Sequence, residues 1–206
     1  MVKTRCRPGA AVALTLFLLL VAAIFYAVPL DYGTQFRMKG DINENGITEE
    51  YELTNSVLTI KEGSKLLWTS PEGYQIDSFA LGDVDNDGKV NLVISLWKKG
   101  SFGDVQPFWH KGQNKDYKNH LFVYKLEGET LKRAWCSSNL DNPILSFTIQ
   151  DVDADGKAEL VVKEGQYKKI AKEKYALDRD GPVQTTVWKW DEWGFCLADS
   201  LTTSDR

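Results

Sequence analysis

Apolar and polar side chains alternate along much of residues 31–206, in short runs broken by Gly, Asn and Asp. An alternation of period two is typical of a β-strand with one buried face. Two other runs, 90–97 and 158–162, are mostly apolar and rich in β-branched residues, which predicts buried strands. Hairpins with a Glu-Gly or Trp-Gly turn are predicted at 57–70, 121–137 and 187–197. The pattern therefore predicts an all-β fold made of a repeated unit of several strands.

The N-terminal end has a different pattern, because residues 10–28 are uncharged and mostly apolar and follow three basic residues. A helix of this length spans about the thickness of the hydrocarbon layer, and flanking positive charges stay in the cytoplasm. We therefore predict a single-pass protein of the cell membrane. It would have a cytoplasmic basic tail at 1–9, a transmembrane signal-anchor helix at 10–28 and an extracytoplasmic domain at 30–206. The alternative is a signal peptide that is cleaved at the small residues 21–23.

Three short acidic loops repeat along the predicted domain. In each loop, side chains that carry oxygen fall at positions 1, 3, 5 and 9, and a Gly stands at position 6. The Gly permits a sharp bend, so that the backbone carbonyl of position 7 can join the candidate ligands. The candidates are Asp41, Asn43, Asn45, Ile47 and Glu49 in the first loop, Asp83, Asp85, Asp87, Lys89 and Asn91 in the second, and Asp151, Asp153, Asp155, Lys157 and Glu159 in the third.

This spacing indicates a site for a hard cation, since Ca²⁺ takes roughly six to eight oxygen ligands. An EF-hand is excluded for the second and third loops, where Ile94 and Val162 stand at position 12 in place of a bidentate Glu. The residues after each loop predict strands and not helices. The alternative explanation is that Asp-Gly and Asn-Gly are ordinary turn formers, whose side chains bond their own backbone.

The loops and the strands after them resemble the FG-GAP and VCBS-type repeats, which occur in integrin α-chain propellers and in bacterial surface proteins. The shared pattern is Asp-x-Asp-x-Asp-Gly-x-x-Asn or Glu, followed by Leu-Val-Ile or Leu-Val-Val. The resemblance covers nearly all of residues 34–206, and only the first loop departs from it, with Asn43 and Asn45 in place of acids. It implies a propeller-like β-repeat domain of about three blade units, in which each loop binds Ca²⁺. Closed propellers use roughly four to eight blades, so an incomplete ring or closure by oligomerisation is also implied.

Charge limits the class of partner. The chain has 29 Asp and Glu against 25 Lys and Arg, three of which precede the apolar run, so the predicted domain is acidic. Domains that bind nucleic acid carry extended basic surfaces, and we therefore exclude nucleic acid as the main partner.

Two cysteines occupy equivalent places in the repeat, because Cys136 and Cys196 each follow the last aromatic residue of a hairpin. An extracytoplasmic location permits a disulfide. Equivalent positions in neighbouring blades usually lie farther apart than a disulfide can span, which argues against a bridge. The sequence leaves open whether the two residues pair.

Two segments, 98–119 and 163–182, interrupt the repeat and mix aromatic residues with Lys and Arg. Long loops of this kind are often functional. We name Phe108, Trp109 and His110 as candidate partner-binding residues, for a cell-surface protein or a carbohydrate. The alternative is that the basic residues are ordinary solvated surface and that the aromatic side chains cover the core.

Catalysis finds little support in the sequence. Only His110 and His120 could act as a base at neutral pH, and no nucleophile motif accompanies either of them. We therefore expect a non-catalytic binding or structural module of the cell envelope that binds Ca²⁺. The alternatives are an anchored or secreted hydrolase of polysaccharide, and a structural subunit that completes a propeller by oligomerising.

Overall fold

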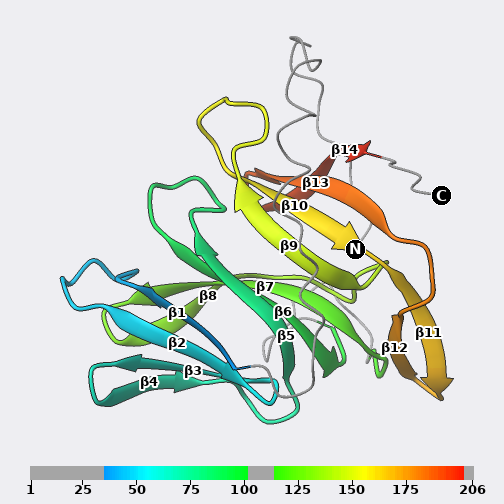
Figure 1. Cartoon of the computed structure of the whole chain (residues 1–206), viewed down its shortest axis with the longest axis horizontal. Coiled ribbons are helices and arrows are strands. Elements are labelled where there is room, and N and C mark those ends of the chain that lie inside the picture. Colours follow the sequence, from blue (N-terminus) through cyan, green and yellow to red (C-terminus); the bar gives the residue numbers. More distant parts are fainter. Residues whose placement is uncertain (1–34, 102–113, 202–206) are drawn as a thin grey trace.

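The structure is a computed structural model that describes residues 35–101 and 114–201 (Figure 1). These residues form fourteen strands and no helix, which confirms the predicted all-β class. Accordingly, no helix in these two ranges is long and apolar enough to cross a bilayer. The predicted cytoplasmic tail and signal-anchor helix, residues 1–28, lie outside the described residues.

Twelve of the strands form three consecutive units of four antiparallel strands, which we call the first, second and third units. The first unit contains β1 (Phe36–Gly40), β2 (Glu49–Thr54), β3 (Val57–Glu62) and β4 (Lys65–Thr69). The second contains β5 (Gln75–Gly82), β6 (Asn91–Lys99), β7 (Tyr117–Glu127) and β8 (Thr130–Cys136). The third contains β9 (Ile144–Gln150), β10 (Glu159–Glu164), β13 (Gln184–Asp191) and β14 (Gly194–Leu201). The two predicted buried strands and the three predicted hairpins are all present within these units.

The remaining two strands form a hairpin between β10 and β13. They are β11 (Gln166–Ala171) and β12 (Lys174–Asp178), and β12 continues the sheet of the second unit by pairing with β7 in parallel, Lys174 opposite Tyr117. The insertion at 163–182 is therefore not a plain loop, as the sequence suggested, but largely a hairpin added to the neighbouring unit. The short alternation in this segment was hidden by its many lysines.

The second unit lies between the other two and is buried on both faces. Successive side chains of a strand point to opposite faces of the sheet. In β6, Leu92 and Ile94 pack into the core shared with the first unit, and Val93 packs into the core shared with the third. All three are fully buried, and the stack in Figure 1 thus has two hydrophobic cores and three layers.

The outward face of the first unit is charged over β1 and β2. In β2, Glu50 and Glu52 stand at the positions that Leu92 and Ile94 hold in β6, counted from the preceding loop. Glu52 pairs with Arg37 at 3.0 Å and Glu50 pairs with Lys39 at 2.5 Å, both across the β1–β2 ladder. Within the described residues, the sheets do not close into a ring.

Cys136 is half-buried at the end of β8, and no disulfide joins it to Cys196 on β14. This outcome agrees with the expectation that equivalent positions in neighbouring units lie too far apart.

Candidate metal centre

The three acidic loops occupy the same place in each unit, where they join the first strand to the second. They connect β1 to β2, β5 to β6 and β9 to β10, and Figure 1 shows them on the same side of the molecule. The second and third loops are also in contact, because the amide oxygen of Asn86 accepts a hydrogen bond from the backbone N–H of Ala158 at 2.8 Å. The prediction that the loops lie between strands is confirmed.

The first residue of each loop organises the turn. The two carboxylate oxygens of Asp83 accept hydrogen bonds from the backbone N–H groups of Asp87 and Gly88, at 3.1 and 2.8 Å. Asp41 and Asp151 make the same two bonds in their loops, at distances within 0.1 Å of these. The Gly at position 6 has a φ between 84° and 87° in all three loops, which a side chain would strain. The three loops thus share one backbone conformation.

The last residue of each loop closes it. Glu49, Asn91 and Glu159 each accept a hydrogen bond from the backbone N–H of position 2, at 2.9, 2.8 and 2.8 Å. All three side chains are buried. Burial raises the pKa of Glu49 above its usual value, since it disfavours the charged form. In the first and second loops, the side chain of position 2 enters a hydrophobic core and anchors the turn.

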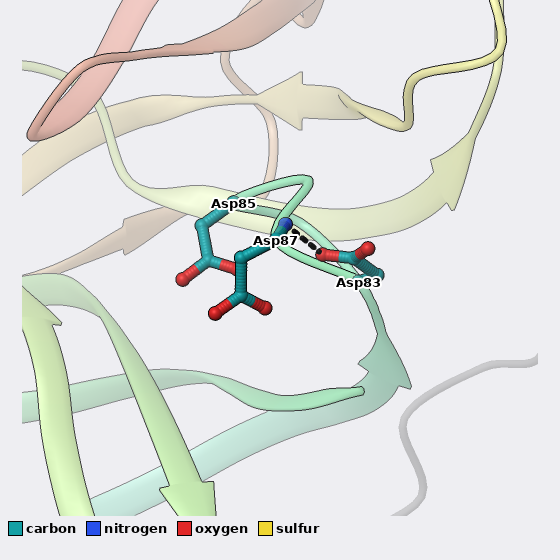
Figure 2. Close-up of side chains that lie close together, drawn as sticks. All are labelled: Asp83, Asp85 and Asp87. Atoms are coloured by element: carbon teal, nitrogen blue, oxygen red, sulfur yellow. Dashed lines mark hydrogen bonds between the residues drawn. The ribbon is translucent and has the colours of Figure 1, made fainter. Parts of the chain in front are cut away.

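Carboxylates converge in two of the loops. One carboxylate oxygen from each of Asp83, Asp85 and Asp87 lies within 4.8 Å of the others, and the same holds for Asp151, Asp153 and Glu159. Figure 2 shows the first of these groups. One oxygen of Asp85, Oδ1, is buried and accepts no hydrogen bond from the described residues. An acceptor of this kind fits an oxygen ligand of a hard cation. Within the part of the chain that the structure describes, the first loop forms no comparable group.

Two lysines that the sequence analysis did not single out contact these groups. Lys125, on β7, places Nζ at 2.7 Å from Oδ2 of Asp85 and also donates to Asp87. Its hydrogen bond to Asp87 lowers the pKa of that carboxyl below its usual value. The third loop repeats the arrangement with Lys189, on β13, whose Nζ lies 2.6 Å from Asp153 and 3.3 Å from Glu159.

In the first loop, the residue that takes the place of these lysines is a glutamate. Glu62, on β3, accepts hydrogen bonds through Oε1 from the side-chain amides of Asn45 and Asn43, at 2.7 and 3.4 Å. Asn43 also donates to the backbone oxygen of Gly128 in the second unit, at 2.8 Å. Both Asn side chains thus present N–H groups, which cannot be cation ligands, to Glu62.

His120, one of the two candidate bases, is part of the core. His120 is fully buried between β6 and β8, and its ring lies 5.7 Å from that of Phe122. Burial lowers its pKa to about 3, so the imidazole stays neutral at ordinary pH. Phe108, Trp109 and His110, the candidate partner-binding residues, lie outside the described residues.

A basic groove lies at the end of the sheets away from the acidic loops, where the β11–β12 hairpin meets β7. It has a volume of about 320 Å³ and is lined by Gln75, Lys99, Lys115, Tyr117, Lys172, Glu173 and Lys174. The backbone N–H of Tyr117 donates to the carbonyl of Glu173 at 2.7 Å, which joins the two walls. The ends of the first insertion thus lie beside the second.

Comparisons with known proteins give one partial likeness. No family model matches the chain, and no solved structure matches it. The chain is 30% identical over 101 residues to the rhamnogalacturonan endolyase YesW of Bacillus subtilis (strain 168). The match covers 46% of this chain but only 15% of the length of that enzyme.

Proposed function

We propose that this chain is a membrane-anchored, extracytoplasmic β-repeat protein of the FG-GAP and VCBS type, whose second and third loops bind Ca²⁺ to stabilise the fold. The observation that carries this proposal is the convergence of carboxylates in two loops of one backbone conformation. Asp83, Asp85 and Asp87 would hold one ion, and Asp151, Asp153 and Glu159 the other, with Asp155 and the carbonyls of position 7 as further ligands. A bound ion would supply charge neutralisation at these loops and no chemistry.

The proposed architecture is an arc of three propeller-like blades, one for each four-stranded unit. The repeated order of strands and the stacking of units through two cores support it. The ion pairs of Glu50 and Glu52 favour an arc that ends at the first unit over a ring completed by other copies, since every face inside a ring would be apolar.

The test of calcium binding compares the purified full chain with and without a chelator. An ion that binds only the folded state stabilises it by mass action, so Ca²⁺ should raise the melting temperature and give heat on titration. Asp87→Ala and Asp155→Ala should each remove one site. Glu72→Ala, an exposed acid away from the loops, is the matched control. Unchanged melting curves together with no calcium uptake would contradict the proposal.

A second candidate function is recognition of an anionic carbohydrate at the basic groove. Residues 98–101, 114–118 and 163–174 carry nine Lys against three Asp and Glu, in a chain whose net charge is −4. Tyrosines stand among these lysines, and Nζ of Lys118 lies 4.6 Å from the centre of the Tyr167 ring. The partial likeness to a rhamnogalacturonan endolyase points to the same class of ligand. We propose binding without cleavage at this groove, whose lining among the described residues is four lysines with Gln75, Tyr117 and Glu173.

The carbohydrate candidate predicts that the chain binds polygalacturonate and not uncharged dextran. Lys172→Met and Lys174→Met together should weaken that binding about tenfold or more, whereas Lys132→Met, at a distant exposed position, should leave it unchanged. Equal binding of both polymers would reject the candidate. Release of unsaturated or reducing ends from polygalacturonate would instead favour the enzymatic alternative.

A further inference from the structure

Each unit places one charged side chain of its third strand beside its acidic loop. Glu49 of the first loop pairs in register with Glu62 on β3. Leu92 pairs with Tyr124, which sets Asn91 of the second loop beside Lys125, the next residue of β7. The third unit has the same geometry, since the Leu160–Trp188 pair sets Glu159 beside Lys189. These three third-strand residues are therefore equivalent positions of the repeat.

The sign of the third-strand charge follows the composition of the loop. The second and third loops have acids at positions 3 and 5, and the facing residue is a lysine whose ammonium contacts those acids. The first loop has Asn43 and Asn45 at the same positions, and the facing residue is Glu62, which accepts from both amides. In all three units the third-strand residue is thus matched to its loop, since lysines face carboxylates and a glutamate faces side-chain amides.

We propose that the third-strand lysine is the built-in counter-ion of its loop in the second and third units. Lys125 and Lys189 neutralise the second and third loops in the absence of a divalent cation, and a cation that enters must displace the ammonium. Glu62 closes the first loop through hydrogen bonds, and that loop needs no ion. The competition with a cation rests on the proposed function, whereas neutralisation by the lysines stands without it.

The contacts explain why ammonium and cation exclude each other. Nζ of Lys189 reaches Asp153 at 2.6 Å and Glu159 at 3.3 Å, which are the oxygens that a cation would need. A lysine is a compact point charge on a flexible stem, so it can occupy the position and also leave it. The side chain of Asp85 is 9% exposed and that of Lys125 is 23% exposed, so solvent screens their attraction less than that of a surface pair.

The first experiment removes the ammonium groups from the purified full chain and keeps their apolar stems. In chelator, Lys125→Met and Lys189→Met should each lower the melting temperature by several degrees, because carboxylates of one loop then repel one another without a partner. Lys132→Met, which removes an exposed lysine paired with Glu127 on the same sheet, is the control and should change it little. Melting temperatures equal to that of the control would overturn the counter-ion role.

The second experiment titrates the same variants with Ca²⁺. If the ammonium competes with the cation, Lys125→Met and Lys189→Met should bind Ca²⁺ about tenfold or more tightly at the altered loop. Unchanged or weaker affinity would overturn the competition. Absence of calcium binding in the wild type and in both variants would reject the proposed function instead, and the melting data in chelator would still decide the role of the lysines.

The third experiment gives the second loop and its third strand the residue types of the first unit. Lys125→Glu alone should be less stable than Lys125→Met, since it adds a charge of the wrong sign to three acids. Asp85→Asn and Asp87→Asn, added to Lys125→Glu, should restore the melting temperature to near that of the wild type and abolish any calcium binding at this loop. A triple variant no more stable than Lys125→Glu would contradict the complementarity.

Discussion

Asp77 of β5 lies against the indole of Trp97, whose Nε1 donates a hydrogen bond to its carboxylate. Burial raises the pKa of Asp77 to about 6, and the bond from Trp97 and the charge of Arg179 only partly oppose this effect. The folded chain therefore holds this proton more tightly than the unfolded chain, whose carboxyl titrates near 4. Folding takes up a proton between these two values, so the contribution of Asp77 to stability falls as the pH rises through about 4 to 6.

Asp77→Asn should remove this dependence on pH. The amide oxygen can still accept from Trp97, and no charge has to be buried. At pH 7.5 the variant should be more stable than the wild type by about 1–3 kcal/mol, with little difference at pH 4. Thermal melts at the two pH values measure the change, and Asp141→Asn, at an exposed position, serves as control. An equal gain at both values would show that ionisation of Asp77 is not the cause.

At the scale of the element, hydrogen bonds hold each loop in its conformation whether or not an ion is bound. Asp151 accepts from the N–H groups of Asp155 and Gly156 at 3.1 and 2.9 Å. Asp151→Ala should therefore destabilise the chain by about 1–2 kcal/mol in chelator as well as in Ca²⁺, because the N–H of Gly156 loses its acceptor and that of Asp155 keeps only the longer bond to Asp153. Asp155→Ala keeps these donors paired with Asp151 and should cost less in chelator. Denaturant unfolding in chelator measures the loss of stability in both variants. Equal losses would show that position 1 of the loop is no more important for the fold than position 5.

The charge count of each loop predicts the rank of their calcium affinities. The third loop offers four carboxylates, the second offers three, and the first offers Asp41 and Glu49 beside two amides that donate to Glu62. We expect the third loop to bind Ca²⁺ most tightly and the first most weakly or not at all, since affinity rises with ligand charge. Titration of variants that keep a single loop intact tests the order. A reversed order would show that loop rigidity dominates.

The loops, their position between strands and their candidate ligands could be predicted from local spacing, because a turn of nine residues forms its own contacts. Lys125, Lys189 and Glu62 could not, since they meet the loops across a strand ladder. They follow position 9 of their loops by 34, 30 and 13 residues, and the insertions make this interval different in each unit. The available signal was the sign of the charge on each third strand, compared after the hairpins had been aligned.

The whole molecule is a stack in which the central unit contributes two apolar faces and the first unit only one. The layered arrangement was foreseeable from the alternation, whereas the end of the stack was not, because Glu50 and Glu52 alternate just as surface positions of any strand do. That the two acids mark the end of the stack follows only from a comparison with Leu92 and Ile94, which hold the equivalent positions in β6 and face a neighbouring sheet.

Glu50→Leu together with Glu52→Ile should give the outer face of the first unit the character of a buried face. We expect this variant to self-associate, because an exposed apolar sheet face is a docking surface. Light scattering of the purified chain should report a larger mass for the variant than for the wild type, while Glu72→Ala leaves the mass unchanged. If the variant keeps the mass of the wild type, the two acids are not what keeps this face apart from other copies.

The charge that each third strand sets against its loop also has a consequence for how such a chain can evolve. Exchange of the lysine for an acid leaves the loop carboxylates without their partner, and exchange of the loop acids for amides leaves the lysine without its own. Lineages can pass from the arrangement around Lys125 to that around Glu62 only through a disfavoured intermediate or by coordinated changes. Among descendants of one ancestor, the loop and the third strand should therefore change together, unit by unit, and the two forms should seldom be mixed within one unit.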